Sequence, residues 1–278
     1  MSTNREIYFA LKSKNNKYLT DFVIKLLLCD SCEYSDFTEL ALRFDDENSN
    51  EQNLLDKSKR IESGEPYQYV MNKAFFLNKS YYVNKNVLIP RQETEQLIIE
   101  IDKKIQELQG FCPKCICDCC TGSGVLAIEM KDRYPNSIVY ATDIDEKAIS
   151  VAKTNAKDKE KNIVFLNGDL LSPLKDKNKL DVLICNPPYI ENKAEIDEQV
   201  YKFEPHIALL AKPGTKYYER MFKDLDEYMS KKYIAGFEIG EDQVDQLTIL
   251  VNKYLKNIQY EFKIDMYNKP RFLIVWKR

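Results

Sequence analysis

Long apolar runs, a secretion signal and a surplus of basic charge are all missing from this chain of 278 residues. No segment approaches the roughly 20 apolar residues that a membrane-spanning helix needs, so we expect no membrane partner. The N-terminal stretch has Arg5 and Glu6 early and lacks the apolar core of a signal peptide, which predicts a cytoplasmic protein. A formal net charge of −3 gives no overall basic field, and we expect no direct nucleic-acid partner.

The pattern of apolar residues changes along the chain. Residues 1–70 carry apolar side chains at helical spacing, as in Ile7 and Leu11, which predicts a small helical domain. Residues 71–92 are predicted to form a hairpin linker. From residue 93 to 278 helices and β-rich runs alternate, which predicts an α/β domain with a mostly parallel sheet covered on both faces. The predicted strands of this domain are 115–119, 137–142, 163–167, 181–185, 233–239, 259–265 and 271–276.

A turn of small residues follows the first of these strands. The sequence DCCTGSG over Asp118–Gly124 leads into a helix-like run, and such a turn lets backbone N–H groups approach a nucleotide-type ligand. About twenty residues later the next strand ends at Asp143, where a carboxylate would bind a ribose diol. The alternative for Asp143 is a surface residue that opens a helix. The joint spacing favours a nucleotide site.

A second loop, Asn186-Pro187-Pro188-Tyr189, follows the apolar strand 181–185. It would place an amide oxygen, carbonyls without neighbouring N–H groups and an aromatic face around one small space. Such a space can clamp a planar NH2 group. A plain proline-rich turn is the alternative, and the upstream glycine loop favours the clamp.

Further motifs accompany these two loops: GEPYQY from Gly64, LIPRQETE from Leu88, FEP from Phe203 and EIG from Glu238. Together they make the chain resemble the HemK/PrmC family of S-adenosylmethionine-dependent methyltransferases, which methylate the side-chain nitrogen of glutamine. The resemblance covers about residues 60–278. It implies the class I methyltransferase fold, a mostly parallel seven-stranded Rossmann-like sheet, with a small helical N-terminal domain and a hairpin connection.

The resemblance also implies which residues form the site. S-adenosylmethionine, which leaves as S-adenosylhomocysteine, is the expected cofactor, and Asn186, Pro187 and Tyr189 are the expected catalytic residues. Pro188 completes the expected substrate-binding set. The expected cofactor-binding residues are Cys120, Thr121, Gly122, Ser123, Gly124, Asp143, Asp169, Leu170 and Asn186. For Asp169 and Leu170 the alternatives are a plain turn and a core contact.

A mechanism follows from the weakness of a carboxamide nitrogen as a nucleophile. We hypothesise that the Asn186 oxygen and the Pro187 carbonyl accept its two N–H bonds while the Tyr189 ring packs on the amide plane. His206, the only histidine, could act as a base. The proton can instead leave after methyl transfer has made the nitrogen acidic, so the reaction does not require that role. Arg91 is expected to anchor its loop or to contact the substrate.

The implied target is the glutamine of the Gly-Gly-Gln tip of peptide chain release factors, which the helical domain of a monomeric enzyme would help to dock. The alternatives are a glutamine of a ribosomal protein, adenine N6 of DNA or RNA in a flipped-out base, and a noncatalytic adenosylmethionine-binding adaptor. The motifs at Gly64 and Pro90 and the missing basic domain favour a protein substrate. The intact clamp argues against an adaptor.

Two positions depart from the family pattern. Cys120 stands where the family commonly has glycine, and we expect it to hold the turn only with a negative φ. Asn268 replaces a second glycine, and because asparagine tolerates left-handed backbone we expect that turn to persist.

Five cysteines fall within nine residues: Cys112, Cys115, Cys117, Cys119 and Cys120. The spacing of Cys112 and Cys115 also occurs in zinc knuckles. Alternate thiols on a strand are ~6.6 Å apart, however, and do not converge on one ion. The sequence therefore predicts buried reduced thiols and no metal.

Overall fold

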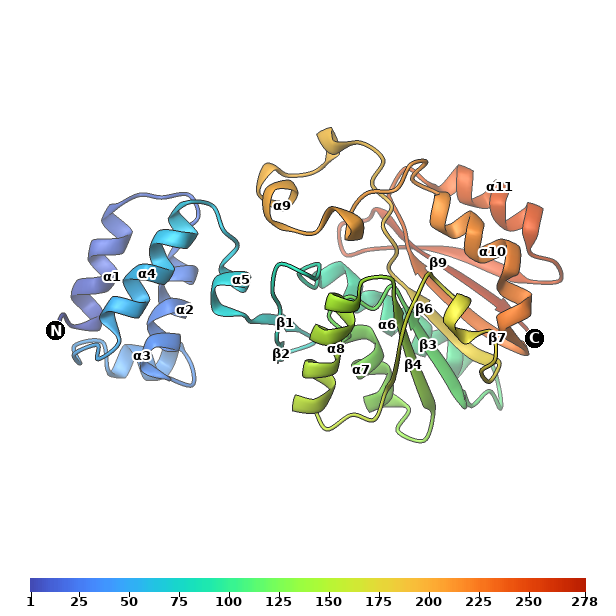
Figure 1. Ribbon diagram of the computed structural model, residues 1–278, viewed down its shortest axis with the longest axis horizontal. Coiled ribbons are helices and arrows are strands. Elements are labelled where there is room, and N and C mark those ends of the chain that lie inside the picture. Colours follow the sequence, from blue (N-terminus) through green and yellow to red (C-terminus); the bar gives the residue numbers. More distant parts are fainter. The chain divides into compact units, whose positions relative to one another are not determined.

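The computed structural model describes residues 1–278, which divide into two compact units, Met1–Lys73 and Ala74–Arg278 (Figure 1). The first unit is entirely helical, as the spacing of apolar residues predicts, and Ile7 and Leu11 are buried in its core. Its helices are α1 (Asn4–Ser13), α2 (Asp21–Cys32), α3 (Phe37–Leu42), α4 (Glu51–Glu62) and α5 (Tyr67–Met71).

The first three helices of this unit have side-chain caps at their N-termini. The Thr3 hydroxyl accepts from the Glu6 backbone N–H while the Glu6 carboxylate accepts from the Thr3 N–H, a capping box that satisfies two free donors. Asn48, in the polar loop before α4, is fully buried and donates to the Asn4 and Ser31 side chains. This loop is therefore part of the packed helical unit.

The second unit contains a hairpin and a seven-stranded sheet. The hairpin strands β1 (Ala74–Phe76) and β2 (Lys79–Tyr81) lie within the predicted linker, and they are joined by Leu77 and Asn78, both with the positive φ that a tight two-residue turn needs. The sheet has the order β5-β4-β3-β6-β7-β9-β8, and β9 runs antiparallel to both of its neighbours, β7 and β8, whereas the other neighbouring strands pair in parallel. Its strands are β3 (Cys115–Cys119), β4 (Ile138–Asp143), β5 (Val164–Asn167), β6 (Leu180–Cys185), β7 (Met229–Glu238), β8 (Gln259–Ile264) and β9 (Pro270–Lys277).

Helices cover both faces of this sheet (Figure 1). Side chains of α6 and α7 share one core with the sheet, and side chains of α10 and α11 share the core on the other face. The α/β fold class and the seven-stranded sheet are confirmed. The helices are α6 (Gln92–Glu107), α7 (Val125–Arg133), α8 (Glu146–Asp158), α9 (Glu198–Phe203), α10 (Lys216–Tyr228) and α11 (Val244–Tyr254), with 3-10 turns at Ser172–Leu174, Lys193–Glu195 and His206–Ala208.

The strand order reverses between β3 and β6, which are parallel neighbours. Strands β4 and β5 continue from β3 in one direction, whereas β7 continues from β6 in the other. A crevice outside the carboxyl ends of the two central strands results from such a reversal, and ligands of open α/β sheets bind there. Both loops singled out from the sequence begin at this edge, one after Cys119 and the other after Cys185.

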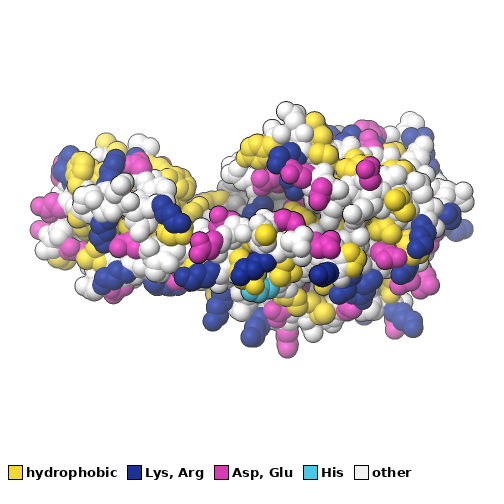
Figure 2. Space-filling view, turned by 90° about the horizontal axis from the view of Figure 1, so that it is seen from above, with side chains coloured by type: hydrophobic (Ala, Val, Ile, Leu, Met, Phe, Trp, Pro, Cys, Tyr) yellow, Lys and Arg dark blue, Asp and Glu magenta, His cyan; other side chains and the backbone are white.

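The surface of the second unit carries mixed charge. Figure 2 shows Lys and Arg side chains interspersed with Asp and Glu on the face that includes the single histidine. None of the helices combines the length and the apolar character that crossing a membrane would require.

Candidate active site

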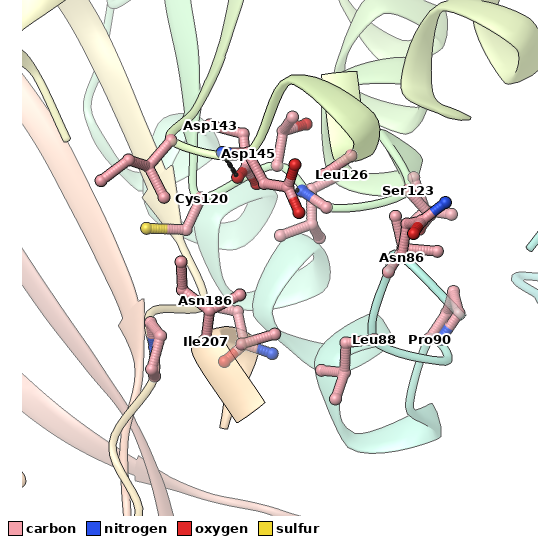
Figure 3. A pocket seen from close by; sticks show the side chains of 18 of the residues that line it. Asn86, Leu88, Pro90, Cys120, Ser123, Leu126, Asp143, Asp145, Asn186 and Ile207 are labelled. Atoms are coloured by element: carbon pink, nitrogen blue, oxygen red, sulfur yellow. Dashed lines mark hydrogen bonds between the residues drawn. The ribbon is translucent and has the colours of Figure 1, made fainter. Parts of the chain in front are cut away.

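A pocket lies at the carboxyl ends of β3 and β6, where the sheet order reverses (Figure 3). The glycine loop, Asp143 and the Asn186 loop all contribute side chains or backbone to this one pocket. Of the residues expected from the sequence, its lining includes Cys120, Thr121, Gly122, Ser123, Asp143, Asp169, Leu170, Asn186 and Pro188. Two segments far apart in the chain thus meet at the predicted place.

Asp143 holds the glycine loop in position. Its carboxylate accepts hydrogen bonds from the backbone N–H groups of Gly122 (2.9 Å) and Asp145 (2.9 Å). Burial raises the pKa of Asp143, and the two backbone donors oppose that shift. The cap of α8 is Asp145, which accepts from the Lys147 N–H. Asp143 is therefore free of the helix-capping role that was its alternative.

Gly124 serves packing rather than the pocket lining. It precedes α7 with φ +83°, and a Cβ atom there would lie 2.9 Å from the Cβ of Ala152 in α8. Glycine is needed because both the backbone angle and the close approach of α8 exclude a side chain. Gly124 is absent from the residues that line the pocket.

Asp118 is a buried residue near the end of β3, and the sequence alone indicated no role for it. It accepts hydrogen bonds from the Thr121 hydroxyl and the Ala127 N–H, while its Oδ1 is buried without a partner. Burial raises the pKa of Asp118 to about 8. This carboxyl group ties β3 to the glycine loop and to the first turn of α7.

Cys120 does not follow the backbone conformation expected for it. Its φ is +61°, in the left-handed region, so the prediction of a negative φ is wrong. The turn keeps the geometry that suits glycine, and the cysteine side chain bears the steric cost of about 1–2 kcal/mol. At the second departure Asn268 has φ +60°, and the expected persistence of that turn is confirmed.

Asn186 is oriented by a buried hydrogen-bonded chain. Its Nδ2 donates to the Thr94 hydroxyl (3.2 Å), which donates to Glu238 (2.6 Å). Glu238 is buried and also accepts from the Tyr189 hydroxyl (3.2 Å). One N–H of the Asn186 amide is engaged by Thr94, which fixes the plane of the side chain and leaves Oδ1 available to accept a hydrogen bond from a ligand. Thr94 and Glu238 belong to motifs quoted from the sequence, but no pattern in the sequence pairs them with Asn186.

Other expected residues lie beside the pocket. Pro187 is buried and Tyr189 is directed to Glu238, and neither is among the lining residues. Burial raises the pKa of Tyr189, so its hydroxyl stays protonated at neutral pH. His206 is exposed, contacts the Tyr201 carbonyl (2.7 Å) and stacks on the Tyr201 ring, outside the lining.

A buried carboxylate joins two of the quoted motifs at the pocket wall. Glu204 accepts from the Arg91 guanidinium (2.6 Å) and from the Ile89 N–H (3.0 Å). The segment before α6 contributes Leu88 and Pro90 to the lining. Arg91 thus anchors this loop, one of the two roles expected for it. Leu88 and Pro90 were not predicted to line the pocket, because they belong to a family motif but carry no chemical group that indicates a binding role.

Asp169 and Leu170 follow β5 on the wall of the pocket. Asp169 forms a bidentate ion pair with Arg220 of α10 (2.5 and 3.2 Å), with both side chains 42% exposed. Leu170 has φ +51° and its carbonyl accepts from Thr142 (2.9 Å). These contacts fix the turn and leave the two side chains at the pocket.

Comparison with known proteins identifies the family of this chain. The Methyltransferase small domain family matches residues 96–206. A release factor glutamine methyltransferase of Staphylococcus aureus is 40% identical over 201 residues, which cover 70% of each chain. The chain belongs to the release factor glutamine methyltransferase family. The predicted family resemblance is confirmed, and the chain is a methyltransferase by this membership.

The likeness extends over nearly the whole chain. The corresponding family member of Streptococcus pneumoniae is 29% identical over 270 residues, 96% of this chain and 89% of the relative. Among solved structures, a methyltransferase from Pyrococcus furiosus superposes with a TM-score of 0.53 at 13% identity and covers 82% of this chain and 97% of its own. This structural likeness establishes the shared fold.

Thr94 offers a test of how this methyltransferase orients Asn186. Thr94→Val keeps the side-chain shape but removes both the acceptor for Asn186 and the donor to Glu238. We expect kcat to fall about tenfold with KM nearly unchanged, because about 1.5 kcal/mol of orienting interaction is lost. Thr94→Ser, which keeps the hydroxyl, is the matched control and should restore kcat. A valine variant with the kcat of the unmodified chain would show that Thr94 does not position Asn186.

Proposed function

We propose that this methyltransferase transfers the methyl group of S-adenosylmethionine to the side-chain amide nitrogen of a glutamine in a peptide chain release factor. The observation that carries the proposal is the single pocket that Asn186 shares with the glycine loop and Asp143. A methyl group can cross only between a donor and an acceptor held in one space. Binding pockets on separate faces of the molecule would have excluded the transfer.

The residues of this pocket suit the proposed cofactor. The Asp143 carboxylate offers acceptors to ribose hydroxyls, and the backbone of Thr121–Ser123 borders the space for the methionine portion. Apolar side chains of Leu126, Ile144 and Leu170 line the same pocket and can enclose an adenine ring. When bound, S-adenosylmethionine supplies an electrophilic methyl group on its positively charged sulfur.

The chain's own contribution is to hold a weak nucleophile. Asn186 presents Oδ1 to one amide N–H of the glutamine, because Thr94 engages its NH2 group. In our proposal the Pro187 carbonyl accepts the second N–H, and the Tyr189 ring supports the amide plane while Glu238 holds its hydroxyl. Two accepted bonds turn the nitrogen's electron density toward the methyl group, so the interaction is strongest in the transition state. The proton released after transfer passes to solvent.

The proposed target rests on the named relatives, each of which is a release factor glutamine methyltransferase. We propose that the enzyme works in the cytoplasm, on the release factors that serve the ribosome there, and that it works as a monomer. A glutamine of a ribosomal protein and adenine N6 of a nucleic acid offer the same planar NH2 group. They are therefore the competing acceptors in a test.

Purified chain with a methyl-labelled donor should label a release factor at the glutamine of its Gly-Gly-Gln tip. Ribosomal protein and DNA, offered at the same concentration, should take up no label above background. A release factor with asparagine in place of that glutamine is the matched control, because it keeps the carboxamide but moves it by one methylene. Mass spectrometry of the tip peptide identifies the residue that carries the methyl group. Label in DNA would contradict the proposal, and so would labelling of the asparagine variant at the same rate as the unmodified release factor.

A further inference from the structure

Three cysteine side chains meet behind the pocket wall. The sulfur atoms of Cys119, Cys120 and Cys185 all lie within 4.8 Å of one another. Cys119 ends β3 and Cys185 ends β6, and the two are paired in the register of these parallel strands. Both are fully buried, whereas Cys120 is partly exposed and lines the pocket.

The conformation of Cys120 completes this cluster. Its left-handed backbone suits glycine, and yet a side chain is present there. The side chain at this strained position adds a third thiol beside those of Cys119 and Cys185. Residues held in such strained conformations are concentrated at binding and catalytic sites.

We propose that Cys119, Cys120 and Cys185 form a binding site for one thiophilic metal ion, such as Zn²⁺. Three sulfurs around an ion at ~2.3 Å would be roughly 4 Å apart, so the observed separations need a shift of less than about 1 Å. Thiolates are the ligands that select Zn²⁺ and Cu⁺ over hard cations. Cys120 lines the pocket, so the ion would reach the site from that side.

Binding of the ion changes the protonation of the cluster. Each thiol that binds the ion releases its proton to solvent as the metal–sulfur bond forms, so the affinity of the site falls as the pH falls.

This site differs from the metal knuckle considered from the sequence. Cys112 is exposed and Cys115 is buried in β3, and neither belongs to a group of three converging ligands. The ligand that sequence spacing could not supply is Cys185, because it is brought to Cys119 only by the pairing of β3 with β6.

A bound ion would occupy the wall of the pocket proposed for the methyl donor, so we infer that the ion inhibits methyl transfer. The binding site itself does not depend on the proposed function, whereas the inhibition rests on it. Zinc binding therefore tests the metal site independently of any measurement of methyl transfer.

Zinc binding to the reduced full chain tests the site, with Zn²⁺ in competition against a chromophoric chelator. We expect one ion per chain and three sulfur neighbours by X-ray absorption. Cys120→Gly is compatible with the positive φ and removes one ligand. Loss of a residue that only supports a ligand can lower metal affinity by roughly 100-fold, so the zinc affinity of this variant should fall by at least that factor. Cys185→Ala is a second variant with the same expected loss, and Cys112→Ser, an exposed thiol, is the control that should bind like the unmodified chain.

Equal zinc affinity in Cys120→Gly and the unmodified chain would overturn the site. Full activity of the zinc-loaded chain, against that of the metal-free chain, would overturn the inhibition. If the metal-free chain methylates none of the offered acceptors while one zinc binds through three sulfurs, the proposed function fails and the metal site stands.

Discussion

Replacing Asn186 by alanine is expected to lower the kcat of methyl transfer by a factor on the order of 10² to 10³ while the affinity for the methyl donor changes only a few-fold. The loss is of the size seen when one preorganised polar group aimed at a transition state is removed. Asn186 is the residue of the clamp whose side chain lines the pocket and is oriented by Thr94. The donor keeps its separate contacts with the glycine loop and Asp143.

The measurement combines single-turnover kinetics with titration of the donor by calorimetry. Asn192→Ala is the matched control, because Asn192 is exposed and follows the same strand, bonded only to Glu195 of its own turn. The fluorescence of Trp276, the chain's only tryptophan, in β9, checks that the second unit remains folded. An alanine variant with unchanged kcat would remove Asn186 from the mechanism, and a loss of donor binding equal to the loss of kcat would make it a cofactor residue.

The regular elements could be predicted where apolar runs end at turn residues. Strand β3 was predicted at its observed bounds, because Cys115–Cys119 is wholly buried between polar loops. Strand β7 begins at Met229, four residues before its predicted start, since Lys231 and Lys232 are exposed and hide the strand in the pattern. Patterns of burial thus mark the centres of elements better than their ends.

The site also has residues that could be predicted from the sequence and residues that could not. Asn186 and the glycine loop could be found because each lies directly after a buried strand, and the sheet topology brings these ends together. The partners that orient Asn186 could not be found, since Thr94 and Glu238 lie 92 and 52 residues away in the chain and their pairing depends on packing. The φ of Cys120 also follows from the loop as a whole rather than from the preference of cysteine.

The buried ion pair of Arg91 and Glu204 is expected to dominate the stability of the pocket wall. The Glu204 side chain is 1% exposed, so Arg91→Ala leaves a buried carboxylate with only the Ile89 N–H as a partner. We expect the free energy of unfolding of the second unit to fall by about 3 kcal/mol, the lower end for a broken buried pair because Arg91 is itself one-third exposed. Urea unfolding followed by Trp276 fluorescence measures the change.

Two further variants distinguish a buried charge from simple loss of contact. Lys269→Ala breaks an exposed pair with Glu241 in the same unit and should cost less than about 1 kcal/mol. The double variant Arg91→Met/Glu204→Leu removes both charges, so it should recover most of the stability that Arg91→Ala loses. If the double variant were as unstable as the single one, the loss would come from packing, and the carboxylate would not be what holds the Leu88–Arg91 loop against the segment that follows α9.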